Sequence, residues 1–141
     1  MVLGSYEMND RTFRETEDMN TSDTKDATPV PAEDPFFGRM NDPTGAGTIQ
    51  GPCGDTMEFY LVVRNDMIED VKYYTNGCGN TRACGHAVAR RAQGRKVTDA
   101  LSISAGEIIR SGECKPESGR HCAILAVSTL YRAIADYLLT P

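Results

Sequence analysis

Residues 57–64 alternate between hydrophobic and polar side chains, which is typical of a half-buried β-strand. Asn65-Asp66 fits a two-residue turn, and residues 67–74 then form the returning strand. The residues expected to face the core are Met57, Phe59, Leu61, Val63, Val71 and Tyr73. The pattern therefore predicts a β-hairpin that ends directly at Gly77-Cys78-Gly79.

Helical signals dominate after this hairpin. A helix capped by Asn80 or Thr81 should follow and end at Gly94. A short helix is expected over residues 97–101, and Ser104-Ala105-Gly106-Glu107 is a capping box that begins another. Residues 111–120 are predicted to be a polar loop.

The last helix is predicted from Cys122 to Leu139. Its polar residues Ser128, Arg132 and Asp136 are four apart, so they form one narrow stripe on an otherwise apolar helix. These interruptions favour a core helix over a membrane span. Strands come first and helices after, which predicts an α+β domain of two layers.

The charge of the chain is concentrated at one end. Residues 1–34 hold nine acidic and three basic side chains of a 141-residue chain with a net charge of −5. This segment is predicted to be a disordered tail, and residues 35–141 to be a single domain. An acidic tail argues against a nucleic-acid arm and against a mitochondrial transit peptide.

Cysteine usage suggests the compartment. The first thirty residues contain no apolar run of a secretory signal, so a cytoplasmic location is expected. Five cysteines cannot all pair, and cytoplasmic thiols stay reduced. Clustered cysteines in this setting indicate metal binding or catalysis.

Three short stretches carry the candidate chemistry: Gly51-Pro52-Cys53-Gly54-Asp55, Gly77-Cys78-Gly79 and Arg120-His121-Cys122. Each places a cysteine at a boundary between predicted elements. Three cysteines with an aspartate and a histidine are enough ligands for one soft metal ion. Cys122 would lie at the N-terminus of the last helix, where the helix dipole lowers a thiol pKa.

Each of these residues also has an ordinary interpretation. Cys122 could be a small buried hydrophobic residue, and His121 could ligate, support a ligand or cap the loop. Asp55 could share one ion with Cys53 or satisfy turn amides. The Gly-rich run over residues 42–47 lacks the lysine and the spacing of a phosphate-binding loop.

The remaining thiols and His86 are assigned outside the site. Cys84 shares a helix face with Val88 and is predicted to be a core residue. Cys114 lies in the predicted polar loop, either exposed and idle or mobile enough to reach the site. His86 is interpreted as a surface histidine or one satisfied by a neighbour.

Several enzyme classes lack their motifs in this sequence. No Cys-x-x-Cys pair, no His-Glu-x-x-His helix and no nucleophile motif of a hydrolase is present. A zinc deaminase would need a second cysteine after Pro52-Cys53.

From about Asn41 to Tyr137 the chain resembles the IscU/NifU-type iron–sulfur cluster assembly scaffolds. The resemblance rests on the three ordered cysteine stretches. It is supported by Asn41-Asp42-Pro43, Ile68-Glu69-Asp70, Ile124-Leu125-Ala126 and Ala133-Ile134-Ala135-Asp136-Tyr137.

The resemblance implies a small antiparallel sheet of about three strands packed on helices. It implies a transient [2Fe–2S] cluster, or a single iron or zinc ion, at Cys53, Cys78 and Cys122, with Asp55 or His121 as the fourth ligand. Cys122 would accept persulfide sulfur from a cysteine desulfurase, and Asp55 would keep the cluster labile. The implied partners are that desulfurase and apo iron–sulfur recipients, without nucleic acid or membrane, and a homodimer sharing one cluster stays open.

The chain also departs from these scaffolds. The Leu-Pro-Pro-Val-Lys segment that a dedicated chaperone reads is replaced by residues 115–120. We therefore expect a non-enzymatic scaffold that assembles and hands on a cluster. The alternatives are a zinc-holding persulfide acceptor, a thiol redox enzyme using Cys114 and Cys122, and a zinc-structured binding module.

Overall fold

The computed structural model describes residues 33–140, apart from Cys53, Lys115 and the side chains of residues 116–119. The predicted acidic tail therefore lies outside the described residues, except for its last two. The elements in chain order are β1 (Gly45–Gln50), β2 (Thr56–Arg64), β3 (Met67–Thr75), α1 (Gly79–Ala92), α2 (Val97–Ala100), α3 (Ala105–Arg110) and α4 (Pro116–Leu139).

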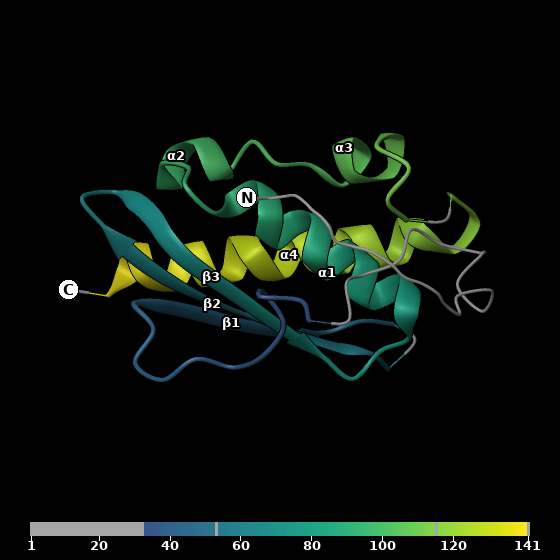
Figure 1. Ribbon diagram of the computed structural model, residues 1–141, viewed down its shortest axis with the longest axis horizontal. Helices are drawn as coiled ribbons and strands as arrows, with labels where there is room; N and C mark the ends of the chain where they lie inside the picture. The colour runs from purple at the N-terminus through teal and green to yellow at the C-terminus, as the bar shows by residue number, and fades with distance from the viewer. Residues whose placement is uncertain (1–32, 53, 115, 141) are drawn as a thin grey trace.

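The three strands form one antiparallel sheet in the order β1-β2-β3, and helices α1 and α4 cover one of its faces (Figure 1). This arrangement confirms the predicted α+β fold with two layers. The core-facing side chains of β2 and β3 are buried as the alternation predicts: Met57, Phe59, Leu61, Val63, Val71 and Tyr73. The alternation therefore identified the face on which the helices pack.

The turn between β2 and β3 is confirmed at Asn65 and Asp66. Their φ angles are 54° and 62°, so both adopt the left-handed conformation of a tight hairpin turn. Asn and Asp tolerate this conformation better than other non-glycine residues because their short polar side chains bond locally.

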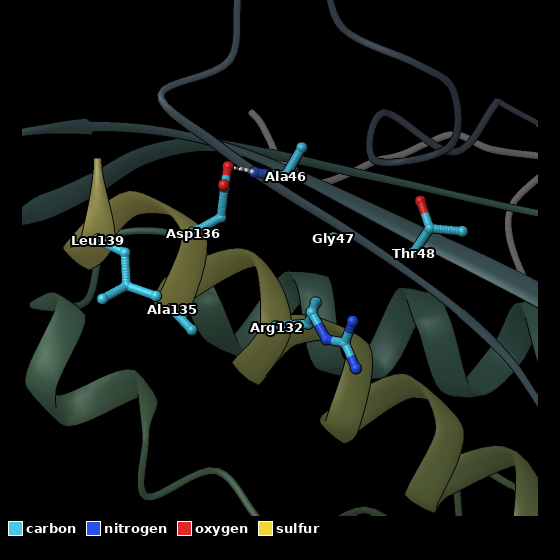
Figure 2. Close-up of a pocket in the computed structure, with 7 residues that line it drawn as sticks. All are labelled: Ala46, Gly47, Thr48, Arg132, Ala135, Asp136 and Leu139. Atoms are coloured by element: carbon cyan, nitrogen blue, oxygen red, sulfur yellow. Dashed lines mark hydrogen bonds between the residues drawn. The ribbon is translucent and has the colours of Figure 1, made fainter. Parts of the chain in front are cut away.

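The resemblance implied about three strands, but the sequence pattern did not locate β1, because its Gly-rich sequence lacks alternation. Its glycines allow helix α4 to lie directly against the strand. A Cβ atom at Gly45 would be 2.6 Å from the Ala133 carbonyl oxygen. In the open groove between β1 and α4, the Asp136 carboxylate accepts a hydrogen bond of 3.0 Å from the Ala46 amide (Figure 2). Asp136 of α4 thus satisfies one amide group of an edge strand.

Helix α1 begins two or three residues earlier than the predicted caps imply. Cys78 is the N-cap residue, so Asn80 and Thr81 lie inside the first turn and the prediction that one of them caps the helix is wrong. The helix ends before Gly94 as predicted, and this glycine has a φ of 86°. Because Cys78 directly precedes the helix, its sulfur lies at the positive end of the α1 dipole.

Helix α4 begins at Pro116, so the predicted loop over residues 111–120 is wrong in its second half. Proline suits the first helical position because its missing N–H would have no helical partner. Cys122 consequently lies in the second turn and not at the helix terminus. From Arg120 to Leu139 the helix is long and apolar enough to span a membrane. It packs against β1, β2 and α1 as a core helix.

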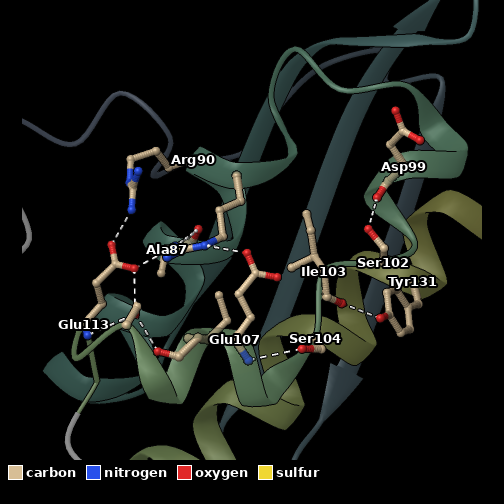
Figure 3. A network of polar contacts seen from close by, with 12 residues as sticks. Ala87, Arg90, Asp99, Ser102, Ile103, Ser104, Glu107, Glu113 and Tyr131 are labelled. Carbon is tan, nitrogen blue, oxygen red and sulfur yellow. Dashed lines mark hydrogen bonds and ion pairs between the residues drawn. The ribbon is translucent and has the colours of Figure 1, made fainter.

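Cys84 and Cys114 form a disulfide, which overturns the expectation that all thiols are reduced. Cys84 is fully buried, as its predicted core role requires, but Cys114 is buried too and is neither idle nor mobile. Beside them, Glu113 pairs with Arg90 and Arg91 of α1 (Figure 3). The segment before α4 is therefore fixed to α1 by a covalent bond and by ion pairs.

Ser104 is confirmed as the N-cap residue of α3, which is the first half of the predicted capping box. The Ser104 hydroxyl accepts a hydrogen bond of 3.1 Å from the Glu107 amide (Figure 3). The Glu107 carboxylate also contacts Arg91 of α1. Helix α3 is thereby joined to α1 on the side that carries the disulfide.

Asp34 is buried against the domain, although the sequence placed it at the end of the acidic tail. Its carboxylate accepts a hydrogen bond of 2.7 Å from the Tyr73 hydroxyl and lies 3.0 Å from His86 Nδ1. His86 is thus a helix histidine satisfied by a neighbour, as one of its two interpretations predicted. Burial and the Asp34 bond raise the pKa of Tyr73, so its hydroxyl stays protonated as a donor.

Candidate metal and cluster site

Three predicted site residues meet at one end of the sheet. Asp55 directly precedes β2, and Cys78 follows β3. Because β2 and β3 are antiparallel, both residues lie at the same end of the sheet. Cys122 approaches from the second turn of α4, which packs beside α1. Two strand ends and two helices thus position these side chains, which are far apart in the sequence.

The Thr81 hydroxyl lies at the centre of this group. It donates a hydrogen bond of 2.9 Å to Asp55 Oδ2. The Thr81 hydroxyl oxygen also lies 3.3 Å from Cys122 Sγ and 3.6 Å from Cys78 Sγ. Thr81 is completely buried, so water does not compete for these contacts. One hydroxyl therefore joins three of the five predicted ligands.

Gly77 is needed for this close approach. A Cβ atom at Gly77 would lie 2.7 Å from Asp55 Oδ2 and 2.8 Å from the Thr81 Cβ. Both distances are shorter than van der Waals contact, so any side chain there would push the carboxylate and the threonine apart. The glycine before Cys78 thus serves the packing of the site.

The hydrogen-bonding capacity of Thr81 matches its neighbours. A hydroxyl has one proton to donate and two lone pairs to accept with. Its proton goes to Asp55, so both lone pairs are available to the two thiols. Asn80 adds a donor at 3.6 Å from Cys122 Sγ.

The two thiols have opposite pKa directions. The pKa of Cys78 is lowered, because the backbone amide of Thr81 favours the thiolate. Burial raises the pKa of Cys122, and the neighbouring Cys78 adds to this effect. The prediction that a helix N-terminus activates Cys122 is therefore wrong, because that position belongs to Cys78 at the start of α1.

The other two predicted ligands do not add to this group. Cys53 lies outside the described residues, so its prediction as a ligand stays a prediction. His121 is exposed and lines a shallow neighbouring groove with Pro52 and Ile124. Two residues were predicted as the fourth ligand. Asp55 lies beside the cysteines, whereas His121 lies at the neighbouring groove.

The described residues form no closed metal site. Within them, no group of three or more His, Cys, Asp or Glu side chains is close enough to hold one ion. The potential ligands still suit a thiophilic metal, because they are two thiols and a carboxylate, and all three lie around the Thr81 hydroxyl. Binding would require the thiols to lose their protons and turn from Thr81 to the ion.

Sequence reasoning missed Thr81 because it was considered only as a helix cap. Its spacing of three residues from Cys78 was the available signal. In a helix whose N-cap residue is Cys78, a residue three positions further on lies on the same side, so Thr81 faces the cysteine. The contact with Cys122 depends on how α4 packs, and no sequence pattern indicates it.

Comparison with known proteins agrees with this architecture. Residues 34–140 match the family model of the NifU-like N-terminal domain. The chain is 36% identical to the iron–sulfur cluster assembly scaffold protein IscU 1 of Archaeoglobus fulgidus over 101 residues, 71% of this chain and 66% of that relative. It is 33% identical to the scaffold protein IscU of Escherichia coli K12, over 72% of this chain and 80% of that relative.

Solved structures show the same fold. A NifU-like N-terminal protein from Brucella abortus has a TM-score of 0.57 at 15% identity, covering 75% of this chain and 87% of its own. A candidate scaffold protein for the SUF system from Fervidobacterium islandicum AW-1 also has a TM-score of 0.57, at 20% identity, covering 70% and 86%. The chain belongs to the NifU-like N-terminal domain family, as the resemblance predicted.

Proposed function

We propose that this protein is a scaffold on which an iron–sulfur cluster is assembled before transfer to an apo-protein. The observation that carries the proposal is the meeting of Cys78, Cys122 and Asp55 around one buried hydroxyl. Relatives that are 33–36% identical are named as cluster assembly scaffolds, which supports the same role here.

Iron and sulfide are the cargo of this protein, and its residues hold them. Cys53, Cys78 and Cys122 supply thiolates for a [2Fe–2S] cluster, and Asp55 supplies an oxygen ligand. Iron bonds to a carboxylate are more easily exchanged than bonds to thiolates in a sulfur-rich site. A mixed donor set therefore suits a cluster that must leave.

Sulfur arrives as a persulfide on a cysteine desulfurase. The Cys122 thiolate attacks the outer sulfur, a new S–S bond forms on Cys122, and the desulfurase cysteine leaves as its thiolate. Because the pKa of Cys122 is raised in the metal-free site, its proton must be lost first. Bound iron would favour this loss, since a cation stabilises the thiolate.

A zinc-holding persulfide acceptor is the second candidate. Two cysteines and an aspartate also suit zinc, which favours tetrahedral sites with sulfur, nitrogen and oxygen ligands. The thiol redox alternative loses its support, because it requires a Cys114 thiol and Cys114 is bonded to Cys84. We propose a non-enzymatic role, with a desulfurase and apo iron–sulfur proteins as partners.

Anaerobic reconstitution of ligand variants tests the function. The protein is incubated with ferrous iron, cysteine and a desulfurase, and then assayed for iron and acid-labile sulfide. Cys78→Ala and Cys122→Ala should lose both, and His121→Ala should keep them because His121 lies outside the group. Full cluster content in the Cys78 and Cys122 variants would contradict the proposed site.

A further inference from the structure

In the described residues, the Thr81 hydroxyl contacts the side chains of Asp55, Cys122 and Cys78. It lies inside the first turn of α1 and is fully buried. A buried threonine in a helix usually bonds its hydroxyl to a carbonyl one turn earlier. The Thr81 hydroxyl bonds instead to Asp55, 26 residues away, and contacts Cys122, 41 residues away. Its partners are side chains with ligand chemistry from two other segments.

We propose that Thr81 is a positioning residue that holds Asp55 in place to bind metal beside the two cysteines. This inference rests on the proposed function and adds a residue to the same site. Among the described residues, Thr81 donates a hydrogen bond to Asp55 Oδ2, so Oδ1 would be the carboxylate oxygen that binds an ion. A hydrogen bond to a carboxylate is stronger than one between neutral groups, so it fixes the side-chain rotamer.

The surroundings of Thr81 hold the hydroxyl itself in place. Its side chain packs against Gly77, where a Cβ atom would meet the threonine at 2.8 Å. The position in α1 limits its χ1 rotamers. The hydroxyl is thus directed from a rigid helix, and Asp55, in the less regular segment before β2, is the side chain that gains order.

The test compares zinc affinities measured by competition with a chromogenic chelator. Thr81→Val removes the hydroxyl and keeps the shape of the side chain. Supporting groups around a metal site typically contribute a factor of about 10 to 100 in affinity, so zinc binding should weaken by that factor. Thr81→Ser keeps the hydroxyl and should restore affinity.

Thr129→Val is the matched control. Thr129 is equally buried, and its hydroxyl donates to the Leu125 carbonyl within α4. It lies seven residues beyond Cys122, about two helical turns away. The same substitution there should leave zinc affinity unchanged. Thermal unfolding of each variant shows whether a loss of affinity reflects a loss of fold.

A double-mutant cycle with Asp55→Ala separates positioning from a general effect on packing. If Thr81 acts through Asp55, Thr81→Val should cause no further loss in the Asp55→Ala background. Unchanged or tighter zinc binding by Thr81→Val, with a wild-type chain that binds zinc, overturns this inference and leaves the scaffold proposal standing. A wild-type chain that binds neither zinc nor ferrous iron overturns both.

Discussion

Gly47 of β1 faces Ala133 of α4 so closely that a Cβ atom at Gly47 would lie 2.7 Å from the Ala133 backbone nitrogen. The strand and the helix therefore touch through backbone atoms. This contact sets the position of α4, and with it the position of Cys122 beside α1. The stability of the fold and the geometry of the site depend on the same helix.

Gly47→Ala should destabilise the protein by about 1–3 kcal/mol, because overpacking forces the strand and helix apart. Urea unfolding followed by circular dichroism measures the change. Gly79→Ala is the control, since among the described residues no atom outside its chain neighbours and its own helix backbone lies within 4 Å of a Cβ there. Equal stability of the two variants would show that the close approach is not required.

In metal-free protein, Cys78 should be alkylated at lower pH than Cys122. The thiolate is the reactive form, the pKa of Cys78 is lowered by Thr81, and the pKa of Cys122 is raised by burial. Cys78 is also the more exposed of the two. Iodoacetamide labelling over a pH series, read by peptide mass spectrometry, gives both profiles. A labelling midpoint for Cys122 at or below the midpoint for Cys78 would contradict the predicted order of the two pKa values.

The pH profiles of labelling distinguish a difference in exposure from a difference in pKa. Exposure changes the rate at every pH by a constant factor, whereas a pKa shift moves the midpoint of the profile. The prediction concerns the midpoints. Unfolded protein in urea is the control, and there the two cysteines should have the same midpoint.

Reduction of the Cys84–Cys114 disulfide should lower the free energy of unfolding by about 3–4 kcal/mol, on the chain-entropy estimate for a loop of this length. The cysteines are 30 residues apart in the sequence. The measurement is urea unfolding with and without dithiothreitol. The double variant Cys84→Ala with Cys114→Ala should show no dependence on the reductant. Equal midpoints for oxidised and reduced wild type would contradict the prediction.

Glu58 should make stability depend on acidity. Arg39 lowers the pKa of Glu58 below its usual value of 4.5. A carboxyl with a lowered folded-state pKa stabilises the protein above its unfolded pKa, and this contribution is lost as pH falls through the folded value. Between neutral pH and pH values below 4.5, wild type should therefore lose more stability than Glu58→Gln. Parallel losses in urea titrations of the two proteins would contradict this.

The sequence predicted those parts of the fold that local patterns determine. Alternation identified the β2–β3 hairpin, Asn65-Asp66 its turn, and Ser104 the start of α3. Strand β1 was missed because Gly45 and Gly47 are explained by tertiary packing against α4. The early start of α4 was missed because residues 115–120 are polar, a composition that also suits the first turns of a helix.

The candidate site was predicted in composition but not in geometry. The cysteine stretches identified Cys78, Cys122 and Asp55, and the structure brings these three together. The central position of Thr81 and the pairing of Cys84 with Cys114 both depend on how α1 and α4 pack. Such contacts between distant segments leave no periodic signal in one sequence.

The most direct test of the scaffold account is transfer of an assembled cluster. The protein is loaded anaerobically with ferrous iron, cysteine and a desulfurase, and an apo-ferredoxin is then added. The account predicts about two irons and two sulfides per cluster, followed by appearance of the ferredoxin spectrum as the scaffold spectrum disappears. Tightly held zinc with no sulfide and no transfer would contradict the scaffold account and favour the zinc-holding sulfur acceptor.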